Sequence, residues 1–233
     1  MNDQSVPVIT VDGPSGVGKG TLARYLAQTL GWHLLDSGAL YRLTGLAALA
    51  RGVALEDETA VAGLAGNLDV VFFGDLDDPD IRVRLDGREV TAEIRSERCG
   101  EAASRVAALP GVRMALLQRQ RDFRQAPGLV ADGRDMGTVV FPDAQLKLFL
   151  TASAGERAKR RYNQLRGKEI NVSIDELVEN IKKRDERDAQ RSVAPLRAAT
   201  DAATLDTTGL DLATVREHAL AYVAQRFGRS GID

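Results

Sequence analysis

The stretch GPSGVGKGT at residues 13–21 constrains the fold of this chain more than any other. It nearly matches the phosphate-binding pattern G-x-x-x-x-G-K-[ST], but Gly20 follows Lys19 and the hydroxyl comes one position later, at Thr21. The preceding VPVITV, at 6–11, is short, β-branched and apolar, which predicts a strand buried on both faces. Apolar residues then recur at helical spacing as far as Leu30. A buried strand, a glycine-rich loop and a helix in this order predict an α/β fold with a phosphate site at the loop.

The chemistry of such a loop is binding of a nucleoside triphosphate. Glycines let the backbone N–H groups approach phosphate, and a lysine adds a full positive charge. The standard motif places a Ser or Thr hydroxyl on Mg²⁺ directly after the lysine. Glycine cannot do so, and Thr21 or water molecules would then take that role. The residues of this loop predicted to bind nucleotide phosphates are Gly13, Pro14, Ser15, Gly16, Val17, Gly18, Lys19, Gly20 and Thr21.

Composition limits the classes of protein to consider. The chain has 233 residues, 44% of them hydrophobic, which is ample for a large core. A net charge of -2 gives no general attraction to nucleic acid or acidic membranes. No apolar run approaches the roughly 18 residues that span a bilayer, and the N-terminal sequence does not resemble a signal peptide. The single cysteine, Cys99, fits a reducing compartment. We expect a soluble, cytoplasmic monomer with no nucleic-acid or membrane partner.

The rest of the chain repeats the alternation of strand and helix. Further buried parallel strands are predicted at 33–35, 128–132, 147–151 and 204–206, with helices at 43–66, 92–108, 111–125, 154–166, 173–191 and 211–227. The helical stretch at 43–66 is expected to break at Gly52. This pattern predicts three layers around a five-stranded parallel sheet. Short antiparallel strands at 68–74, 81–87 and 88–90 interrupt it. They predict a small inserted antiparallel-β/α domain at 65–100, within a core formed by 1–64 and 101–233.

Charged residues follow the strand GLVAD, at the edge of the sheet where ligands bind in open α/β folds. Asp132 suits the role of holding the water shell of Mg²⁺ beside the loop, although an aspartate in Asp-Gly is also a common turn residue. Arg134 and Asp135 come next, and we expect one to bind phosphate and the other to read a base. The alternative is a local salt bridge between them.

The helix at 173–191 carries charge on its apolar face. Its apolar stripe consists of Ile174, Leu177, Val178 and Ile181. At about 100° per residue, the same face continues through Arg184, Asp188 and Arg191. Inward charges are costly unless they are paired or face a ligand. The two arginines and the aspartate suit a phosphate and a sugar hydroxyl, or the helix end simply emerges into water.

Six basic residues and one acidic residue lie in GERAKRRYNQLRGK at 155–168. The functional interpretation is a short lid, about 155–170, whose arginines, Arg157 and Arg161 among them, close over ATP and exclude water. The alternative is an ordinary solvated helix face. Nucleic-acid binding is not favoured, because Tyr162 is the only aromatic residue in the stretch.

Four runs of the sequence resemble the bacterial cytidylate (CMP/dCMP) kinases, namely DGPSGVGKGT, HLLDSGALYR, ADGRDMGTVVFPDA and KKRDERDAQR. The resemblance extends from about residue 6 to residue 225. It implies a P-loop NTPase fold with an inserted monophosphate-binding domain and a short lid. It also implies phosphorylation of CMP and dCMP by ATP and Mg²⁺, giving CDP and dCDP, as part of pyrimidine metabolism.

The resemblance also implies residue roles. On the acceptor side it places Ser37 and Arg42 next to the monophosphate, Ser104, Arg113 and Asp135 at the cytosine, Arg134 and Arg184 on the CMP phosphate, Asp188 at the ribose, and Arg191 near the nucleotide. No catalytic base is needed, because the acceptor phosphate is already anionic near neutral pH. The transfer then requires only in-line positioning of the two phosphate groups and neutralisation of their charge. We expect this charge to come from Lys19, Arg42, Arg134 and Arg184.

Two other functions stay open at this point. One is a kinase of another small acceptor, such as UMP or a shikimate-type metabolite; the insert and the inward arginines favour a nucleotide instead. The other is a regulatory module that binds a nucleotide and signals to a partner. A GTP switch would need Asn-Lys-x-Asp to read guanine, and the sequence lacks it.

Overall fold

A computed structural model describes residues 6–73, 82–166 and 173–228 of the chain. Contacts between Cα atoms divide it into two compact units, one formed by residues 3–34 and 124–233 and the other by residues 35–123. The predicted insert at 65–100 lies within the second unit, where residues 74–81 are outside the described part.

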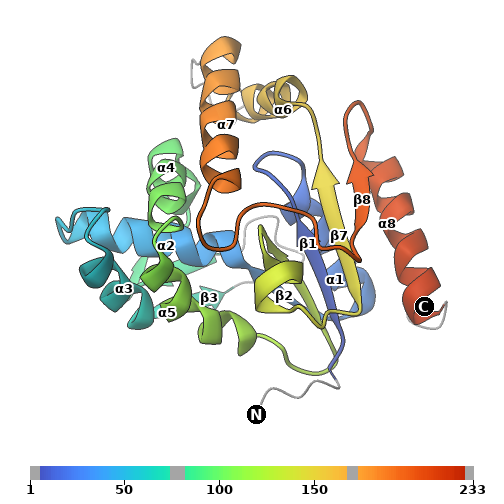
Figure 1. Ribbon diagram of the computed structural model, residues 1–233, viewed down its shortest axis with the longest axis horizontal. Coiled ribbons are helices and arrows are strands. Elements are labelled where there is room, and N and C mark those ends of the chain that lie inside the picture. Colours follow the sequence, from blue (N-terminus) through green and yellow to red (C-terminus); the bar gives the residue numbers. More distant parts are fainter. Residues whose placement is uncertain (1–5, 74–81, 167–172, 229–233) are drawn as a thin grey trace. The chain divides into compact units, whose positions relative to one another are not determined.

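The first unit is built on a five-stranded sheet in the order β2-β6-β1-β7-β8 (Figure 1). Its strands are β1 (Val8–Asp12), β2 (His33–Asp36), β6 (Leu129–Gly133), β7 (Leu146–Thr151) and β8 (Ala203–Asp206). β1 pairs in parallel with β6 and β7, and β7 pairs in parallel with β8. All five residues of β1 are buried, as its apolar, β-branched sequence predicts for a central strand. The predicted α/β class and the five parallel strands are therefore confirmed.

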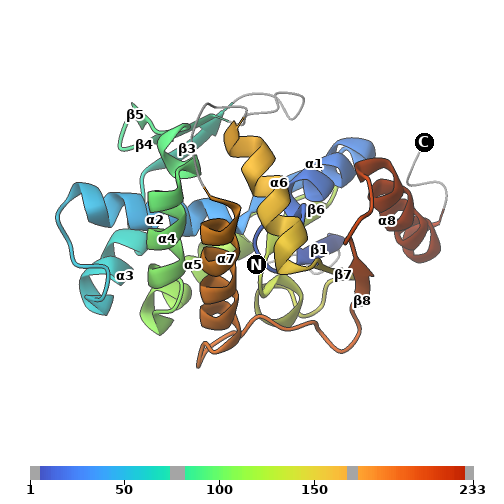
Figure 2. The ribbon, with the colours of Figure 1, turned by 90° about the horizontal axis from the view of Figure 1, so that it is seen from above.

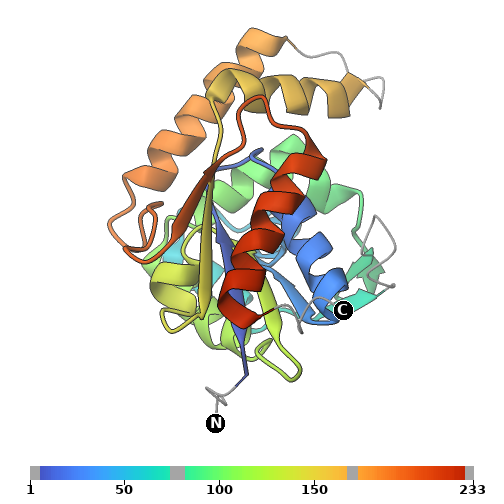
Figure 3. The ribbon, with the colours of Figure 1, turned by 90° about the vertical axis from the view of Figure 1, so that its right-hand side faces the viewer.

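Helices complete this unit. They are α1 (Lys19–Leu30), α6 (Ala154–Arg166), α7 (Ile174–Ala189) and α8 (Leu212–Phe227), with one π-helical turn at Met136–Val140. α1 and α8 lie side by side over the sheet (Figure 3). Their apolar faces form a core with the strands that includes Leu22, Leu26 and Val223. α6 and α7 pack against each other (Figure 2), around Ala158, Leu165 and Leu177.

The second unit combines helices with an antiparallel sheet in the order β3-β4-β5. Its elements are α2 (Ser37–Ala50), α3 (Glu58–Gly66), β3 (Val70–Phe73), β4 (Arg82–Leu85), β5 (Arg88–Glu89), the 3-10 turn Glu93–Arg95, α4 (Glu97–Val106) and α5 (Pro110–Arg121). Polar side chains cap α2, α3 and α4, as when Ser96 Oγ accepts a hydrogen bond of 3.1 Å from the N–H of Cys99 at the start of α4.

The break expected at Gly52 in the helical stretch 43–66 is confirmed, because α2 ends at Ala50 and α3 begins at Glu58. Two details differ from the sequence-based expectations. Met136–Val140 forms a π-helical turn that no periodicity predicted. Ile174, assigned to the apolar stripe of α7, is 43% exposed because it is the first residue of the helix, and the packed stripe begins at Leu177. Across the described ranges, no helix has the length and apolarity needed to cross a membrane.

Candidate active site

The glycine-rich loop joins β1 to α1 and passes close to the neighbouring strand. Gly13 has a φ of 145°, and a Cβ there would lie 2.2 Å from the carbonyl oxygen of Leu150 in β7, so only glycine fits. Lys19 is the first residue of α1 and is buried. Its Nζ donates a hydrogen bond of 2.9 Å to the carbonyl oxygen of Pro14 and lies 3.9 Å from Asp132 Oδ1 at the end of β6. The loop therefore closes around a buried ammonium group.

The surroundings of the Lys19 side chain disfavour its charged form. Burial, together with the positive charge of Arg134, lowers the pKa of Lys19 from 10.5 to about 7, whereas Asp132 opposes the shift. Arg184 acts in the same direction as Arg134. Three cationic groups thus face one site, and an anion bound there would stabilise all of them.

Asp132 lies directly beside the residue that breaks the standard loop motif. A Cβ on Gly20 would be 3.3 Å from Asp132 Oδ2, so a serine or threonine at this position would crowd the carboxylate. Gly20 keeps the space between the start of α1 and Asp132 open. In the described residues there is no cluster of three or more His, Cys, Asp or Glu side chains that could hold a metal ion by itself.

Asp12, at the end of β1, organises the turn after β6 and was not predicted from the sequence. Its carboxylate accepts hydrogen bonds of 2.8 Å from the backbone N–H groups of Met136 and Gly137. Burial raises the pKa of Asp12 to about 6, although these two hydrogen bonds act against the shift. Asp12 therefore fixes the backbone directly after Arg134 and Asp135. The signal was available, because an acidic residue immediately before a phosphate loop, at the end of a buried strand, needs a partner.

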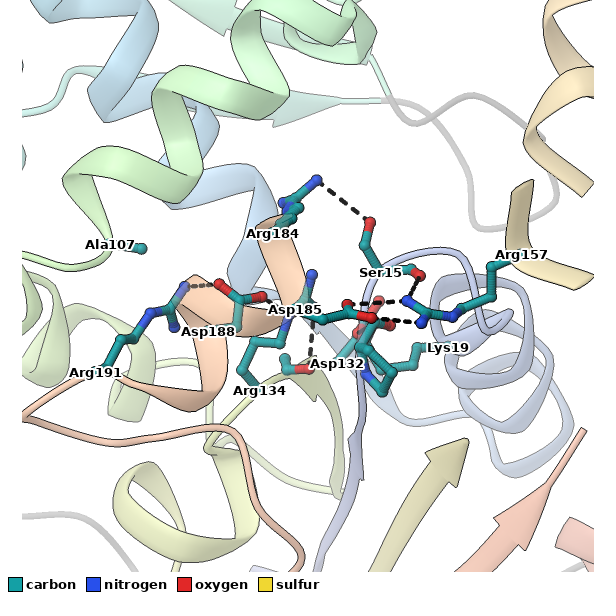
Figure 4. A network of polar contacts seen from close by, with 12 residues as sticks. Ser15, Lys19, Ala107, Asp132, Arg134, Arg157, Arg184, Asp185, Asp188 and Arg191 are labelled. Atoms are coloured by element: carbon teal, nitrogen blue, oxygen red, sulfur yellow. Dashed lines mark hydrogen bonds and ion pairs between the residues drawn. The ribbon is translucent and has the colours of Figure 1, made fainter. Parts of the chain in front are cut away.

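Arg134, Asp188 of α7 and Arg191, which follows the end of that helix, form a buried charged cluster (Figure 4). Arg134 Nε donates a hydrogen bond of 3.0 Å to Asp188 Oδ2, and Arg191 donates to Asp188 Oδ1. Burial alone would raise the pKa of Asp188, but the charges of Arg134 and Arg191 outweigh it and hold that pKa below its usual value. Asp188 is 1% exposed, so this part of the helix faces inward and does not emerge into water. Arg134 pairs with Asp188 rather than with its neighbour Asp135, which is also buried.

Arginines of α6 and α7 also contact the loop. Arg184 Nη1 donates to Ser15 Oγ over 3.3 Å, and Arg157 Nη1 donates to the Ser15 carbonyl oxygen over 3.1 Å. Arg160, which the sequence pattern did not distinguish from its basic neighbours, donates to the carbonyl oxygens of Val17 and Thr207. Arg161 instead contacts Gln164 on its own helix. Of the predicted lid, residues 167–170 lie outside the described part of the chain.

The second unit contains the remaining residues expected on the acceptor side. Ser37 Oγ donates a hydrogen bond of 2.7 Å to Gln120, and Arg42 Nη1 donates one of 2.6 Å to the carbonyl oxygen of Ile94. Arg113 is buried over the ring of Tyr41. Ser104 differs from these, because its hydroxyl is buried and has no hydrogen-bond partner among the described residues. A buried hydroxyl without a partner is costly, and a ligand could satisfy it.

Comparison with known proteins identifies the family. Residues 9–225 match the profile of the family described as Cytidylate kinase. A protein named cytidylate kinase from Shewanella denitrificans is 57% identical over 220 residues, which cover 94% of this chain and 97% of that protein. Another from Pseudomonas fluorescens is 59% identical over 220 residues, covering 94% and 96%. A third from Aeromonas salmonicida is 56% identical over 225 residues, covering 97% of both. The chain therefore belongs to the cytidylate kinase family.

Proposed function

We propose that the protein transfers the γ-phosphoryl group of ATP directly to the phosphate of CMP or dCMP, and that the transfer takes place at the loop of residues 13–21. Membership of the cytidylate kinase family supports the reaction. The location of the site is supported by one observation: the three cations Lys19, Arg134 and Arg184 lie together beside a phosphate-binding loop. Two phosphate groups that must approach each other need this concentration of positive charge.

On the donor side, the loop and the start of α1 bind the ATP phosphates. Their N–H groups carry the partial positive charge of the helix N-terminus, and Lys19 adds a full charge. Bound phosphate raises the pKa of Lys19 from its depressed value, because it replaces lost hydration with a direct opposite charge.

The residues around Gly20 fit a hydrated Mg²⁺ ion. Mg²⁺ usually keeps several waters and binds through one or two carboxylates and the substrate phosphates. Asp132 supplies one carboxylate at the end of β6, and Gly20 leaves space in front of it. Thr21 is the hydroxyl available at the start of the helix. When bound, the ion neutralises charge on the donor phosphates.

On the acceptor side, arginines bind the CMP phosphate and acids read the nucleoside. Arg134 and Arg184 bind the phosphate, and Arg42 adds charge next to it. Asp188 accepts a hydrogen bond from a ribose hydroxyl through lone pairs that its two arginine partners leave available. Arg191 lies beside it and keeps it ionised.

Cytosine is selected by its pattern of donors and acceptors. It carries an amino group where uracil carries a carbonyl oxygen. An ionised Asp135 accepts a hydrogen bond from that amino group and repels the oxygen of uracil. Arg113 offers donors to the acceptors of the ring, and the unsatisfied hydroxyl of Ser104 supplies a further hydrogen bond. Ser37 lies near the monophosphate.

No side chain has to act as a general base. The attacking oxygen belongs to a phosphate that is already anionic, so no hydroxyl proton is removed. The protein contributes alignment and neutralisation, which the fixed arginines and the loop provide. We further propose that the enzyme works as a monomer in the cytoplasm, where Cys99 remains a buried free thiol.

Ligand-dependent thermal stability tests this proposal without assuming turnover. A ligand that binds only the folded protein stabilises it by RT ln(1 + [L]/Kd). We expect CMP and dCMP to raise Tm at concentrations where UMP, AMP and shikimate have little effect. Greater stabilisation by UMP or by shikimate would support the other kinases considered above.

A further inference from the structure

Arg157 occupies a position that a lid arginine reaching for ATP would not be expected to occupy. Its side chain is 5% exposed, and its guanidinium makes four hydrogen bonds with the five N–H groups it has. Nε donates to the carbonyl oxygen of Ala152, and Nη1 donates to that of Ser15 in the loop. The remaining two bonds go to both carboxylate oxygens of Asp185 on α7, one of them at 2.9 Å. Arg157 therefore joins α6, α7 and the phosphate loop (Figure 4).

These bonds determine which way the loop peptides face. In a planar trans peptide the carbonyl and the following N–H point in opposite directions. Because Arg157 holds the carbonyl of Ser15, the N–H of Gly16 turns to the side away from α6. Arg160 holds the carbonyl of Val17 in the same way over 3.3 Å, which turns the N–H of Gly18. Those two N–H groups are then presented for phosphate.

The backbone at Gly16 shows how closely α6 approaches the loop. Gly16 has a φ of 83°, and a Cβ there would lie 3.3 Å from the Cβ of Arg157. The guanidinium can keep this position only if its charge is neutralised, since it is buried. Asp185 neutralises it with a bidentate contact, the geometry in which an arginine–carboxylate pair is strongest.

We propose that Asp185 is a positioning residue for ATP: it holds Arg157 against the Ser15 carbonyl and so keeps the phosphate loop in the form that binds the triphosphate. This inference rests on the proposal that ATP binds at the loop. In this role Asp185 acts through its bidentate contact with Arg157 and not through a contact of its own with ATP. Its neighbour on α7, Glu186, is exposed and contacts Gln190, which makes it a matched control.

The experiment measures binding of the non-hydrolysable ATP analogue AMP-PNP with Mg²⁺, and binding of CMP, by calorimetry. Asp185→Asn is nearly isosteric, but it replaces one acceptor oxygen with an NH₂ group and removes the charge. We expect it to raise the Kd of AMP-PNP about tenfold, a change of about 1.4 kcal/mol. The Kd of CMP should stay within about twofold, and Glu186→Gln should change both constants by no more than that.

Two further variants separate positioning from simple loss of stability. Asp185→Glu keeps the charge and should recover most of the affinity for AMP-PNP. Arg157→Ala and the double variant Arg157→Ala/Asp185→Asn should weaken AMP-PNP binding equally, since both remove the same contact to the loop. Circular dichroism and Tm show whether each variant is folded.

Two results would overturn the proposal. One is unchanged AMP-PNP binding in folded Asp185→Asn, whatever its Tm, because the pair would then only support the fold. The other is tighter binding, which would mean that Asp185 competes with phosphate for Arg157. Failure of the proposed function would give a different result. Asp185→Asn would still bind AMP-PNP more weakly than the wild-type protein, but the wild-type protein would not phosphorylate CMP.

Discussion

Arg134 Nε lies 3.0 Å from Asp188 Oδ2, and this contact joins the turn after β6 to helix α7. Asp188 is 1% exposed, and the Arg134 side chain is 18% exposed. The proposed phosphate ligand and the proposed ribose ligand are therefore fixed to each other before any substrate binds.

Asp188→Ala should impair use of the acceptor more than binding of ATP. It removes the proposed ribose contact and the carboxylate that holds Arg134. We expect kcat/KM for CMP to fall at least about tenfold, and the ratio of CMP to dCMP activity to change if Asp188 contacts the 2′-hydroxyl. Steady-state kinetics with both acceptors and with varied ATP measures this. The exposed variant Glu179→Gln on the same helix is the control, and normal kinetics in Asp188→Ala would reduce the contact to a structural ion pair.

The same pair predicts how stability depends on pH. The pKa of Asp188 is lowered in the folded protein, so its contribution is fully present above the unfolded value near 3.8 and is lost as the pH falls below it. Asp188→Asn should cost about 3 kcal/mol or more at pH 7, because it leaves two arginines without their buried partner. Denaturant unfolding at pH 7 and at pH 3 tests this, and a pH-independent difference would contradict it.

Lys19→Met should greatly lower activity and stabilise the fold. We expect kcat to fall about 100-fold or more, because a buried charge at the transferred phosphoryl group is lost. The pKa of Lys19 is lowered to about 7, so below pH 7 the folded protein carries a buried charge that costs stability, and this cost disappears as the pH rises towards 10.5. Tm of the variant should exceed that of wild type by about 4–8 °C at pH 6, assuming about 2 kcal/mol, and by less at pH 9. A lower Tm at pH 6 would show that Lys19 stabilises the loop.

Gly20→Ala should separate stability from function. Alanine is the better helix former by up to about 1 kcal/mol, so unfolding should require equal or more denaturant. The added Cβ lies 3.3 Å from Asp132 Oδ2 and takes space in front of that carboxylate. We expect the Mg²⁺ concentration for half-maximal activity to rise about tenfold. Gly63→Ala, in α3 with nothing within 4 Å of the new Cβ, is the control. An unchanged Mg²⁺ requirement would remove the explanation given for Gly20.

Much of this arrangement could be predicted, because it depends on short-range pattern. The position of the phosphate loop between a buried strand and a helix could be predicted from the residues just before and just after Lys19. Helical periodicity alone placed Asp188 on the inward face of α7, and burial confirms that face.

What could not be predicted depends on contacts between distant residues. Asp12 binds the N–H of Gly137, 125 residues away, and the π-helical turn that it caps has no sequence period of its own. Among the closely spaced basic residues of α6, periodicity could not show that Arg160 reaches the loop while Arg161 contacts Gln164. Likewise, Arg157 pairs with Asp185 across two helices, and the packing of these helices against each other cannot be read from the sequence pattern.

Asp135→Ala should reduce the preference for cytosine over uracil. A hydrogen bond to a charged group contributes about 1.5–3 kcal/mol, so kcat/KM for CMP should fall roughly 10- to 150-fold. UMP should lose much less, because an Asp135 that reads cytosine would repel the O4 of uracil in the wild-type enzyme. The measurement is kcat/KM for CMP and UMP in wild type and variant. If the CMP/UMP ratio of kcat/KM stays within about twofold of the wild-type ratio, Asp135 does not read the base, and Ser104 or Arg191 would take that role.

The most direct test of the central claim is the steady-state rate of ATP consumption by the wild-type protein with CMP, dCMP, UMP, AMP, GMP and shikimate as acceptors. Formation of CDP or dCDP is confirmed by chromatography. We predict the highest kcat/KM for CMP and dCMP, a dependence on Mg²⁺, and a kcat lower by about 100-fold or more in Lys19→Met. A higher kcat/KM for UMP, AMP, GMP or shikimate, or no transfer to CMP at all, would contradict the assignment.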